Sequence, residues 1–549
     1  MKEAEEKMTG YASIDKPWLK YYSDEAVSAP LPECTIYEYL WENNKEYFDS
    51  VALNYFGRRI SFGELFDRIE KAAKAFTAIG IRQGDTVIMV TVTTPETIYA
   101  LYGLNRIGAI ANMVDPRTSV EGIKEYISEA NAKYILTIEA AYSKIEKAVI
   151  GFAMQKIIVI SPADSLFQPS KFLFNVANYL KGTASKLSNI CLRWNDFISN
   201  GDNIQPKYAA YQRDTCCVIV HTGGTTGTPK GVMLSNDNLN AAAFQGIITG
   251  IDLKREHTWL NIMPPFIAYG IGNGLHLPLA MGMETILIPQ FDPAKFADLL
   301  NKYKPNHMVG VPSHYNNIIH SDKMKNADLS YIIAPTVGGD SMRSELEKET
   351  NEFLAAHNCS YQVSKGYGMT EVCAAVSICV SNECNEVGMA GIPFTHTIIS
   401  IFDIESGEEL TYGERGEICI TGPNTMLGYY NNQVASAEIM KIHKDGKVWV
   451  HSGDIGYMTE KGFLYVVGRI KRMIIRHDGF KVFPTFIENV VTSHSAVSAC
   501  CVVGIEDKNH GQGRLPIAYI VLSQDNRKNE DKIRQELVVL CEKELPEYA

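Results

Sequence analysis

A regular alternation of helix and strand patterns is the feature of this chain that most restricts its fold. Ser61-Phe62-Gly63-Glu64 has the form of a capping box, and apolar residues recur after it at helical spacing as far as Gly80. The segments that follow are predicted as strands over Thr86 to Val90, Ile110 to Val114 and Tyr134 to Thr137, and as helices over Pro95 to Ile107 and Val120 to Ala130. Strands that alternate with helices form a parallel sheet covered on both faces. The sequence therefore predicts an α/β protein.

The length of 549 residues exceeds what one hydrophobic core supports and indicates about three or four compact units. After a series of polar turns between Trp449 and Lys471, new strands are predicted at Ala499 to Val503 and Ile517 to Leu522, with a final helix at Asp531 to Lys543. We expect a large N-terminal domain over residues 1–470, with parallel-rich sheets flanked by helices, and a small α+β C-terminal domain over residues 471–549.

The composition is that of a folded enzyme, with 46% hydrophobic and 21% charged residues. A formal net charge of -11 argues against nucleic-acid binding, which needs a clustered basic excess. The charged N-terminus lacks the apolar stretch of a secretory signal. The most apolar long stretch, Ile271 to Pro289, is interrupted by His276 and Glu284 and predicts a buried core segment rather than a transmembrane helix. We expect a cytoplasmic protein.

The cysteines are interpreted as reduced thiols. Two adjacent pairs, Cys216/Cys217 and Cys500/Cys501, lie in apolar runs that predict buried strands. Cys373, Cys379 and Cys384 lack the spacing and the neighbouring histidines of a zinc site, so core packing is the preferred interpretation there too.

A glycine-rich loop follows the strand predicted at Cys216 to Val220. It reads His221-Thr222-Gly223-Gly224-Thr225-Thr226-Gly227-Thr228-Pro229-Lys230-Gly231. Its glycines let the backbone approach a ligand closely, and the threonine hydroxyls and the lysine suit the oxygens of a polyphosphate. A surface turn is the alternative, but a turn does not need this set of hydroxyls. Lys230 is followed by Gly231 rather than by Ser or Thr, so this is not a Walker loop.

The loop closely resembles the phosphate-binding signature of the acyl-adenylate-forming superfamily, which contains acyl-CoA synthetases, the adenylation domains of peptide synthetases and luciferases. Other motifs follow in that family's order, so the resemblance spans nearly the whole chain. It implies an AMP-binding domain followed by a small mobile lid. The residues that it assigns to the nucleotide in this loop are Thr222, Gly223, Gly224, Thr225, Gly227 and Thr228, with Thr226 and Lys230 as catalytic residues.

A second motif, Gly366-Tyr367-Gly368-Met369-Thr370-Glu371, resembles the family segment in which the tyrosine packs on adenine, the threonine contacts the α-phosphate and the glutamate binds magnesium. The resemblance thus assigns Gly366, Tyr367 and Gly368 to the nucleotide, and Thr370 and Glu371 to catalysis. A carboxylate oxygen suits this hard cation. Gly338 and Gly339 resemble the turn beside the adenine and acyl pocket, a motif that is weak by itself. By itself, the six-residue motif is also compatible with a turn that caps a strand.

Two further motifs lie towards the C-terminus. Trp449-Val450-His451-Ser452-Gly453-Asp454 resembles the family's ribose-binding segment, which implies that Asp454 accepts from both ribose hydroxyls; a solvated aspartate in a turn is the alternative. Arg469 in the hinge motif Gly468 to Arg472 is implied to reach the ribose as well. Whether Lys471 or Arg472 is the pivot stays open. The run from Arg476 to Pro484 resembles the loop that enters the site for thioester formation, so Arg476, Gly479 and Lys481 are expected there; an exposed charged hairpin is the alternative.

The implied reaction uses ATP, Mg²⁺ and coenzyme A. AMP is transferred to a carboxylate with release of pyrophosphate, and a thiol then opens the mixed anhydride. Because two anions must meet, catalysis is expected to depend on positioning and charge neutralisation, through Mg²⁺ on Glu371 and through Thr225, Thr226 and Lys230. No covalent enzyme intermediate is expected.

The acid is predicted from the segment after the loop. Met263 to Gly270 contains no acidic residue to pair with a substrate ammonium, which disfavours an amino acid, and Ile267 stands where many relatives have histidine. An apolar pocket with room left by Gly272, Gly274 and Gly338 predicts a medium- or long-chain fatty acid, with an aromatic acid as the second choice.

Two other functions stay open from the sequence. One is an acyl- or aryl-AMP ligase that loads a carrier protein, and the other is a nucleotide-binding protein without ligase activity. The second arises because the sequence stops at Leu545-Pro546-Glu547-Tyr548-Ala549, which resembles the start of the segment before the family's catalytic lysine. We expect a truncation there rather than an inactive protein.

Overall fold

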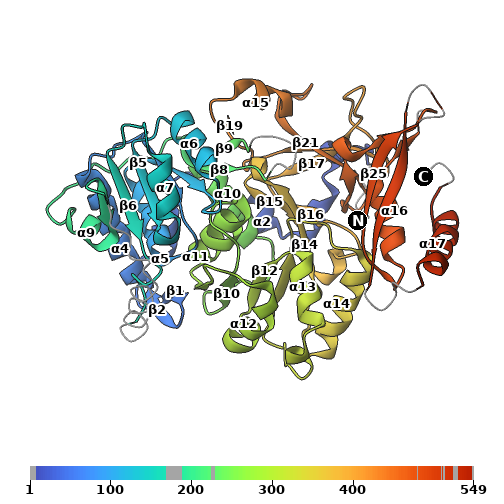
Figure 1. Cartoon of the computed structure of the whole chain (residues 1–549), viewed down its shortest axis with the longest axis horizontal. Helices are drawn as coiled ribbons and strands as arrows, with labels where there is room; N and C mark the ends of the chain where they lie inside the picture. The colour runs from blue at the N-terminus through green and yellow to red at the C-terminus, as the bar shows by residue number, and fades with distance from the viewer. Residues whose placement is uncertain are drawn as a thin grey trace, which may run out of the picture.

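The computed structural model describes residues 8–167, 188–223, 229–478, 480–507, 510, 513–523 and 529–546. Figure 1 shows two large sheets with their helices at the left and lower centre, and the C-terminal elements at the right. None of the helices in the described part of the chain combines the length and hydrophobicity needed to cross a bilayer.

The first sheet contains the alternation predicted from the sequence. Its strands run in the order β19 (Gly428–Tyr429), β9 (Gly231–Ser235), β8 (Cys216–His221), β4 (Ile110–Val114), β3 (Thr86–Val90), β5 (Tyr134–Ile138), β6 (Lys156–Ile160) and β7 (Cys191–Arg193). From β8 to β7 all neighbours are parallel, whereas β9 and β19 are added antiparallel. The predicted parallel core is confirmed.

Helices cover this sheet in two groups, with contacts between helices within each group. One group is α4 (Phe62–Ala78), α5 (Pro95–Arg106) and α9 (Trp194–Ser199), and the other is α6 (Val120–Glu129) and α7 (Tyr142–Ala148). The Ser61 side chain accepts from the Glu64 backbone N–H at 3.2 Å and so begins α4 as predicted, but the capping box is only half formed, because the Glu64 carboxylate accepts from Arg58 instead. Gly80, with φ +97°, lies just beyond its end.

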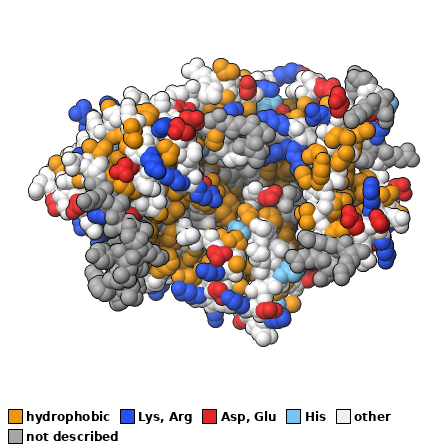
Figure 2. Space-filling model, in the orientation of Figure 1, with side chains coloured by type: hydrophobic (Ala, Val, Ile, Leu, Met, Phe, Trp, Pro, Cys, Tyr) orange, Lys and Arg blue, Asp and Glu red, His pale blue; other side chains and the backbone are white. Residues whose placement is uncertain are grey.

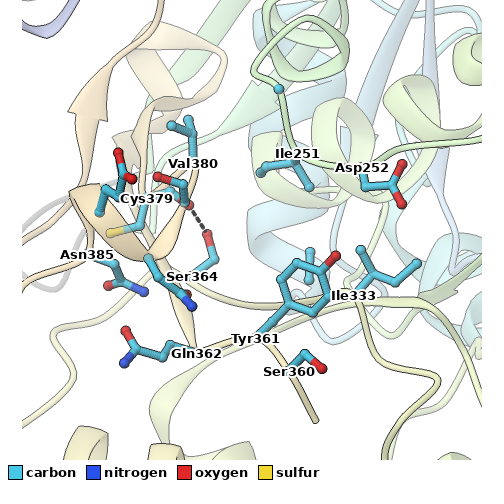
Figure 3. A pocket seen from close by; sticks show the side chains of 15 residues that line it. Ile251, Asp252, Ile333, Ser360, Tyr361, Gln362, Ser364, Cys379, Val380 and Asn385 are labelled. Carbon is cyan, nitrogen blue, oxygen red and sulfur yellow. Dashed lines mark hydrogen bonds between the residues drawn. The ribbon is translucent and has the colours of Figure 1, made fainter. Parts of the chain in front are cut away.

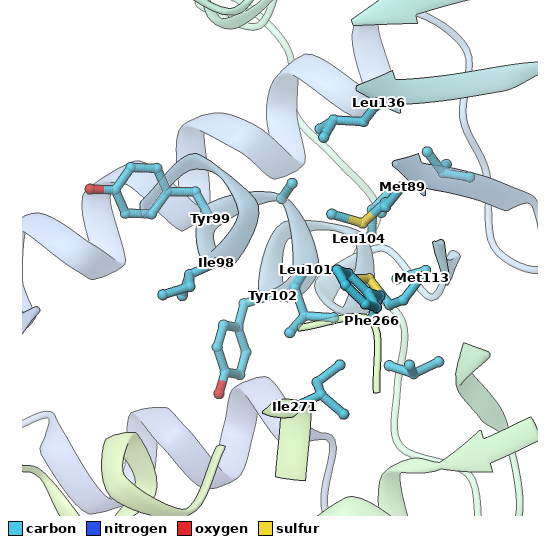
Figure 4. Close-up of a cluster of buried hydrophobic side chains, with 14 of the residues drawn as sticks. Met89, Ile98, Tyr99, Leu101, Tyr102, Leu104, Met113, Leu136, Phe266 and Ile271 are labelled. Atoms are coloured by element: carbon cyan, nitrogen blue, oxygen red, sulfur yellow. The ribbon is translucent and has the colours of Figure 1, made fainter. Parts of the chain in front are cut away.

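Helix α5 is almost wholly buried because it lies between the first sheet and the segment around Ile271. Figure 4 shows Leu101, Leu104, Met113, Phe266 and Ile271 in this cluster. The segment from Ile271 onward thus lies in the core, as predicted. It begins in the π-helix Tyr269–His276 and continues into α11 (Leu277–Met281).

The second sheet runs in the order β16 (Ile392–Pro393), β15 (Ala374–Ile378), β14 (Ser364–Met369), β13 (Ala334–Val337), β12 (His307–Gly310), β10 (Thr258–Asn261), β11 (Glu284–Leu287), β1 (Val51–Tyr55) and β2 (Arg58–Ser61). It is parallel from β14 to β1 and antiparallel at both ends. The helices that accompany this second sheet are α10 (Asn236–Ile247), α12 (Phe296–Tyr303), α13 (Pro312–Ile319) and α14 (Ser344–Ala356). The second hydrophobic cluster lies between this sheet and these helices.

A third, antiparallel sheet runs β17 (Ile398–Phe402), β18 (Gly416–Thr421), β21 (Val448–Met458) and β20 (Met440–Ile442), with β22 (Leu464–Arg469) also paired to β21. Short helices lie near it or at the start of the chain: α1 (Ala12–Asp15), α2 (Asp24–Ser28), α3 (Ile36–Asn44) and α15 (Gln433–Ile439). Its core includes Trp18 and Tyr22 from the N-terminal segment.

The C-terminal elements are two hairpins and two helices with a separate hydrophobic cluster. They are β23 (Ile474–Ile475), β24 (Lys481–Val482), α16 (Pro484–Thr492), β25 (Val497–Glu506), β26 (Arg514–Leu522) and α17 (Glu530–Glu544). The predicted strands and helix are confirmed, but the prediction that Cys500 and Cys501 are both buried is wrong. Cys501 is exposed and Cys500 half-buried, because in the described structure much of the β25–β26 hairpin stays accessible.

Candidate active site at the carboxyl ends of the strands

The glycine-rich loop connects β8 to β9 and is closed at its base. The Thr222 backbone N–H donates to the Lys230 carbonyl at 3.0 Å, and the Lys230 N–H donates to Thr222 Oγ1 at 3.1 Å. Gly223 belongs to the described loop base, whereas Gly224, Thr225, Thr226, Gly227 and Thr228 lie outside the described residues. Since β8 is parallel to β4, the loop leaves the carboxyl edge of the parallel sheet, the usual position for ligands in such folds.

Glu371 is brought to this loop by Tyr429. Strand β19 pairs with β9, so Tyr429 lies next to the strand that leaves the loop. Its hydroxyl donates to Glu371 Oε1 at 2.7 Å, and Lys230 Nζ lies 4.7 Å from the centre of its ring. Glu371 itself is buried in the turn after β14. The predicted lysine therefore lies over the ring of Tyr429, and the predicted carboxylate lies at its hydroxyl. No sequence motif had indicated this tyrosine.

Tyr367, Asp454 and Arg469 form a second chain of contacts. The Tyr367 hydroxyl donates to Asp454 Oδ2 at 2.8 Å, and Arg469 Nε lies 3.0 Å from Asp454 Oδ1. Asp454 on β21 and Arg469 on β22 are direct cross-strand partners. Burial raises the pKa of the Asp454 carboxyl, while Arg469 and Tyr367 oppose that rise. The two predicted ribose residues are thus brought together with the predicted adenine residue.

The predicted glycines lie where backbones approach closely. A Cβ on Gly368 would lie 1.7 Å from the Ala374 carbonyl oxygen, and one on Gly366 3.0 Å from that of Ser377, because β14 pairs tightly with β15. Gly338 follows β13, where an added Cβ would lie 3.4 Å from the Gly366 carbonyl oxygen, and Gly339 has φ +77°. Close backbone packing and turn conformation therefore explain these four glycines as well as ligand binding does. Thr370 lies in the turn between Met369 and Glu371.

Arg476 and Lys481 each pair with an acidic residue that belongs to neither of these two clusters. Arg476 Nη2 lies 3.0 Å from Asp478 Oδ2, and Lys481 Nζ lies 2.8 Å from Glu405 Oε1, beyond the end of β17. Gly479 lies outside the described residues.

The π-helix carries Gly272 and Gly274, two of the glycines expected to leave room for the acyl chain. A Cβ on Gly272 would lie 3.6 Å from the Cys373 carbonyl oxygen, next to the Glu371 turn. His276 is buried between the Tyr102 hydroxyl (3.0 Å) and Asn240 Oδ1 (2.9 Å), and burial lowers its pKa to about 3, so the ring is neutral. Figure 2 shows the molecule in the orientation of Figure 1, with a hollow near the centre of the visible face. Hydrophobic side chains lie inside this hollow, and Lys and Arg side chains lie near its rim.

A cavity of about 470 Å³ lies elsewhere, at the amino ends of β13 and β14. Figure 3 shows Tyr361, Ser364 and Cys379 among the residues that line it. Gly338 and the Tyr367 motif lie towards the opposite ends of the same strands. Because ligands of parallel sheets bind at the carboxyl ends, this cavity is not assigned to the nucleotide.

Comparisons with known proteins show the family. The AMP-binding enzyme family matches residues 40–430, and the AMP-binding enzyme C-terminal domain matches residues 487–549. The chain is 27% identical to a long-chain-fatty-acid–CoA ligase of Bacillus subtilis (strain 168), over 94% of this chain and 91% of the relative. It is 30% identical to a probable 4-coumarate–CoA ligase 1 of Dictyostelium discoideum, over 85% and 82%.

Solved structures share the fold. An anthranilate CoA ligase in complex with anthranoyl-AMP superimposes with a TM-score of 0.79 at 20% identity, covering 94% of this chain and 92% of that one. An o-succinylbenzoate coenzyme A synthetase from Bacillus subtilis, in complex with ATP and magnesium ion, gives 0.72 at 24% identity with 93% of each chain covered. The chain therefore belongs to the AMP-binding enzyme family of the acyl-adenylate-forming superfamily, as an acid–CoA ligase.

Proposed function

We propose that this enzyme activates a medium- or long-chain fatty acid with ATP as an acyl adenylate and then transfers the acyl group to coenzyme A. The observation that carries the proposal is the contact of Lys230 and Glu371 with the same tyrosine, Tyr429, at the base of the glycine-rich loop. A cation and a carboxylate next to a loop of this composition suit a triphosphate with its metal ion.

In the first step an oxygen of the fatty-acid carboxylate attacks the α-phosphorus of ATP, and pyrophosphate leaves. The Lys230 ammonium would neutralise charge on the phosphate oxygens, which is the main requirement when two anions react. Tyr367, Asp454 and Arg469 would hold the nucleoside, so that the α-phosphorus is presented in one orientation. In the second step the CoA thiol attacks the acyl carbonyl and AMP leaves.

The residues present fit a magnesium ion. Glu371 supplies a buried carboxylate whose Oε1 is held by the Tyr429 hydroxyl, and oxygen ligands are those that Mg²⁺ prefers. Bound there, the ion would add positive charge beside the phosphates. Glu371 is the residue that we propose to hold it.

We also propose that residues 1–470 and 471–549 act as two domains, with the second closing on the first. Support comes from the separate hydrophobic cluster of the C-terminal elements and from the position of Arg469, which contacts Asp454 directly before the junction. Lys481 would reach the adenylate only after its hairpin leaves Glu405, and Arg476 only after it releases Asp478 within the same hairpin.

An aromatic acid is the second candidate, and one observation favours it. The Tyr269 hydroxyl is buried on the π-helix without a hydrogen-bond partner among the described residues, and a Cβ on Gly338 would lie 3.5 Å from it. A buried hydroxyl without a partner is costly, and a polar group on an aryl substrate would satisfy it.

Pyrophosphate release measured against a series of saturated acids from C6 to C18 and against hydroxylated aryl acids tests the proposal. We expect the highest kcat/KM among the saturated acids and a CoA thioester detected by mass. A clear preference for the aryl acids would favour the second candidate, and release of pyrophosphate without any CoA thioester would indicate a carrier protein as acceptor.

Glu371→Gln tests the metal site. We expect pyrophosphate release to fall about 100-fold, on the scale of a lost charge interaction in the transition state, with little change in melting temperature. Glu352→Gln, an exposed position on α14, is the control and should retain activity. Full activity of the Glu371 variant would exclude this residue as the metal ligand.

A further inference from the structure

Two histidines and an aspartate meet in the C-terminal elements, outside the nucleotide site. His477 lies in the turn between β23 and β24, whereas Asp507 and His510 follow β25. Asp507 Oδ2 lies 3.3 Å from His477 Nδ1 and 2.8 Å from His510 Nδ1. These three atoms all lie within 4.8 Å of one another. Such a separation places all three within reach of one metal ion.

The backbone is shaped to bring these residues together. Gly513 has φ +91°, and a Cβ at this position would lie 2.2 Å from the His477 backbone nitrogen. Only glycine adopts this conformation readily and leaves that space, so the β23–β24 turn can approach the β25–β26 connection closely. The two imidazole rings are stacked with their centres 3.4 Å apart and their planes 3° from parallel. Backbone packing and ring stacking therefore hold the cluster together.

Hydrogen bonding alone does not account for the cluster. Although His477 Nδ1 is buried and 3.3 Å from the carboxylate, it forms no hydrogen bond of acceptable geometry within the described residues. The Asp507 side chain is only 1% exposed. Buried polar atoms are normally satisfied, and an ion between the two imidazoles and the carboxylate would satisfy His477.

A second group of possible ligands, Glu417, Cys419 and His451, differs in this respect. Both ring nitrogens of His451 already have partners, since Nδ1 lies 2.7 Å from Glu417 Oε2 and Nε2 lies 2.9 Å from His443 Nε2. The other Glu417 oxygen accepts from the Gly453 N–H at 2.9 Å. This group is explained as a hydrogen-bond network beside Asp454.

We propose that His477, Asp507 and His510 bind one Zn²⁺ ion. Two imidazole nitrogens and one carboxylate oxygen form the ligand set of a borderline transition metal, whereas Mg²⁺ prefers oxygen ligands, so the Mg²⁺ that accompanies ATP does not compete. A cavity of about 590 Å³ adjoins Asp507 and His510 and gives a water molecule access to the fourth position. The ion links the turn that carries Arg476 and Asp478 to the β25–β26 hairpin and restrains that turn. This site does not depend on the proposed acid substrate.

The test is Zn²⁺ titration of tag-free protein against a chromophoric chelator, in the presence of excess Mg²⁺. We expect one Zn²⁺ per chain at this site, and His477→Ala, Asp507→Asn and His510→Ala should each weaken binding by about 10-fold or more, because even outer-shell changes cost 10- to 100-fold. Substitution with Co²⁺ should give visible d–d absorption that disappears in these variants. His510→Cys, which retains a ligand for Zn²⁺, should restore binding.

Two controls separate this site from other metal binding. His494→Ala removes another carboxylate-paired histidine of the C-terminal elements, and Cys419→Ala alters the second ligand group; neither should change Zn²⁺ affinity. His510 is the most exposed of the three ligands, with 47% of its side chain accessible, so its replacement should leave folding intact. Absence of stoichiometric Zn²⁺, or equal affinity in the parent and His510→Ala, would overturn the proposal.

Discussion

The Tyr429 hydroxyl donates to Glu371 Oε1 at 2.7 Å although the two residues are 58 positions apart. The contact exists because a two-residue strand, β19, pairs with the strand that leaves the glycine-rich loop. The same ring lies beneath Lys230 Nζ, so one side chain sets the separation between a cation and a carboxylate. Tyr429 is therefore expected to position both charged groups.

Tyr429→Phe should separate these two contributions. The ring remains for Lys230, but Glu371 loses its hydrogen-bond donor, and loss of such an outer-shell partner commonly costs about 10- to 100-fold in metal affinity. We expect the Mg²⁺ concentration for half-maximal pyrophosphate release to rise by at least about 10-fold. Tyr211→Phe, which removes a hydroxyl bound to Asp237, is the matched control. An unchanged Mg²⁺ dependence would show that Tyr429 does not orient the carboxylate.

Asp454→Ala should weaken ATP binding by up to about 3 kcal/mol, the scale of hydrogen bonds to a charged group. Arg469 is 71% exposed, so Arg469→Ala should cost less, about 1 kcal/mol. Calorimetric titration with ATP in the absence of acid measures both. Equal ATP affinity in the Asp454 variant and the parent would remove Asp454 from the nucleotide site.

Glu96 should make stability depend on pH. It is 1% exposed on α5, and burial raises its pKa to about 7. Between its ordinary pKa and about 7 the folded state therefore binds more protons than the unfolded state, so the free energy of unfolding falls as pH rises through this window. The loss, complete above pH 8, should be about 3 kcal/mol.

Glu96→Gln lacks this titration, so the difference between parent and variant should change by that amount between pH 4.5 and pH 8. Urea unfolding at the two pH values measures it, with the exposed Glu121→Gln as control. Parallel profiles for the parent and the Glu96 variant would contradict a raised pKa.

Gly368→Ala should destabilise the protein strongly. The new Cβ would lie 1.7 Å from the Ala374 carbonyl oxygen, so the paired backbones of β14 and β15 must separate, at a cost of about 3 kcal/mol or more. Gly272→Ala is the comparison, because its nearest neighbour would be 3.6 Å away. Thermal unfolding should show a large loss of stability for the first and little change for the second. Similar melting temperatures for the two variants would refute this account.

Local patterns predicted much of the fold. The start of α4 follows from the cap at Ser61 and that of α5 from Pro95, and β3, β4 and β5 follow from short apolar runs. These signals act over a few residues, so the sequence contains them directly. The resemblance of their motifs to those of the family assigned both Asp454 and Arg469 to the ribose, but their contact with each other was not predicted.

Contacts between distant segments could not be predicted in this way. Tyr429 lies on a strand of two residues, too short to leave a pattern, and His477 meets Asp507 only through the turn permitted by Gly513. The exposure of Cys501 could not be predicted for a similar reason, since an apolar run in β25 does not reveal how many faces of the hairpin are covered by other elements. The pairing of Lys481 with Glu405 joins residues 76 positions apart.

The pairing of β19 with β9 also bears on how the protein is made. Lys230 and Tyr429 are about 200 positions apart, and contacts of such separation form late because the intervening chain must first be ordered. During synthesis, the strands around the glycine-rich loop leave the ribosome long before Tyr429 does. Lys230 and Glu371 therefore gain their shared contact with Tyr429 only after translation has passed residue 429.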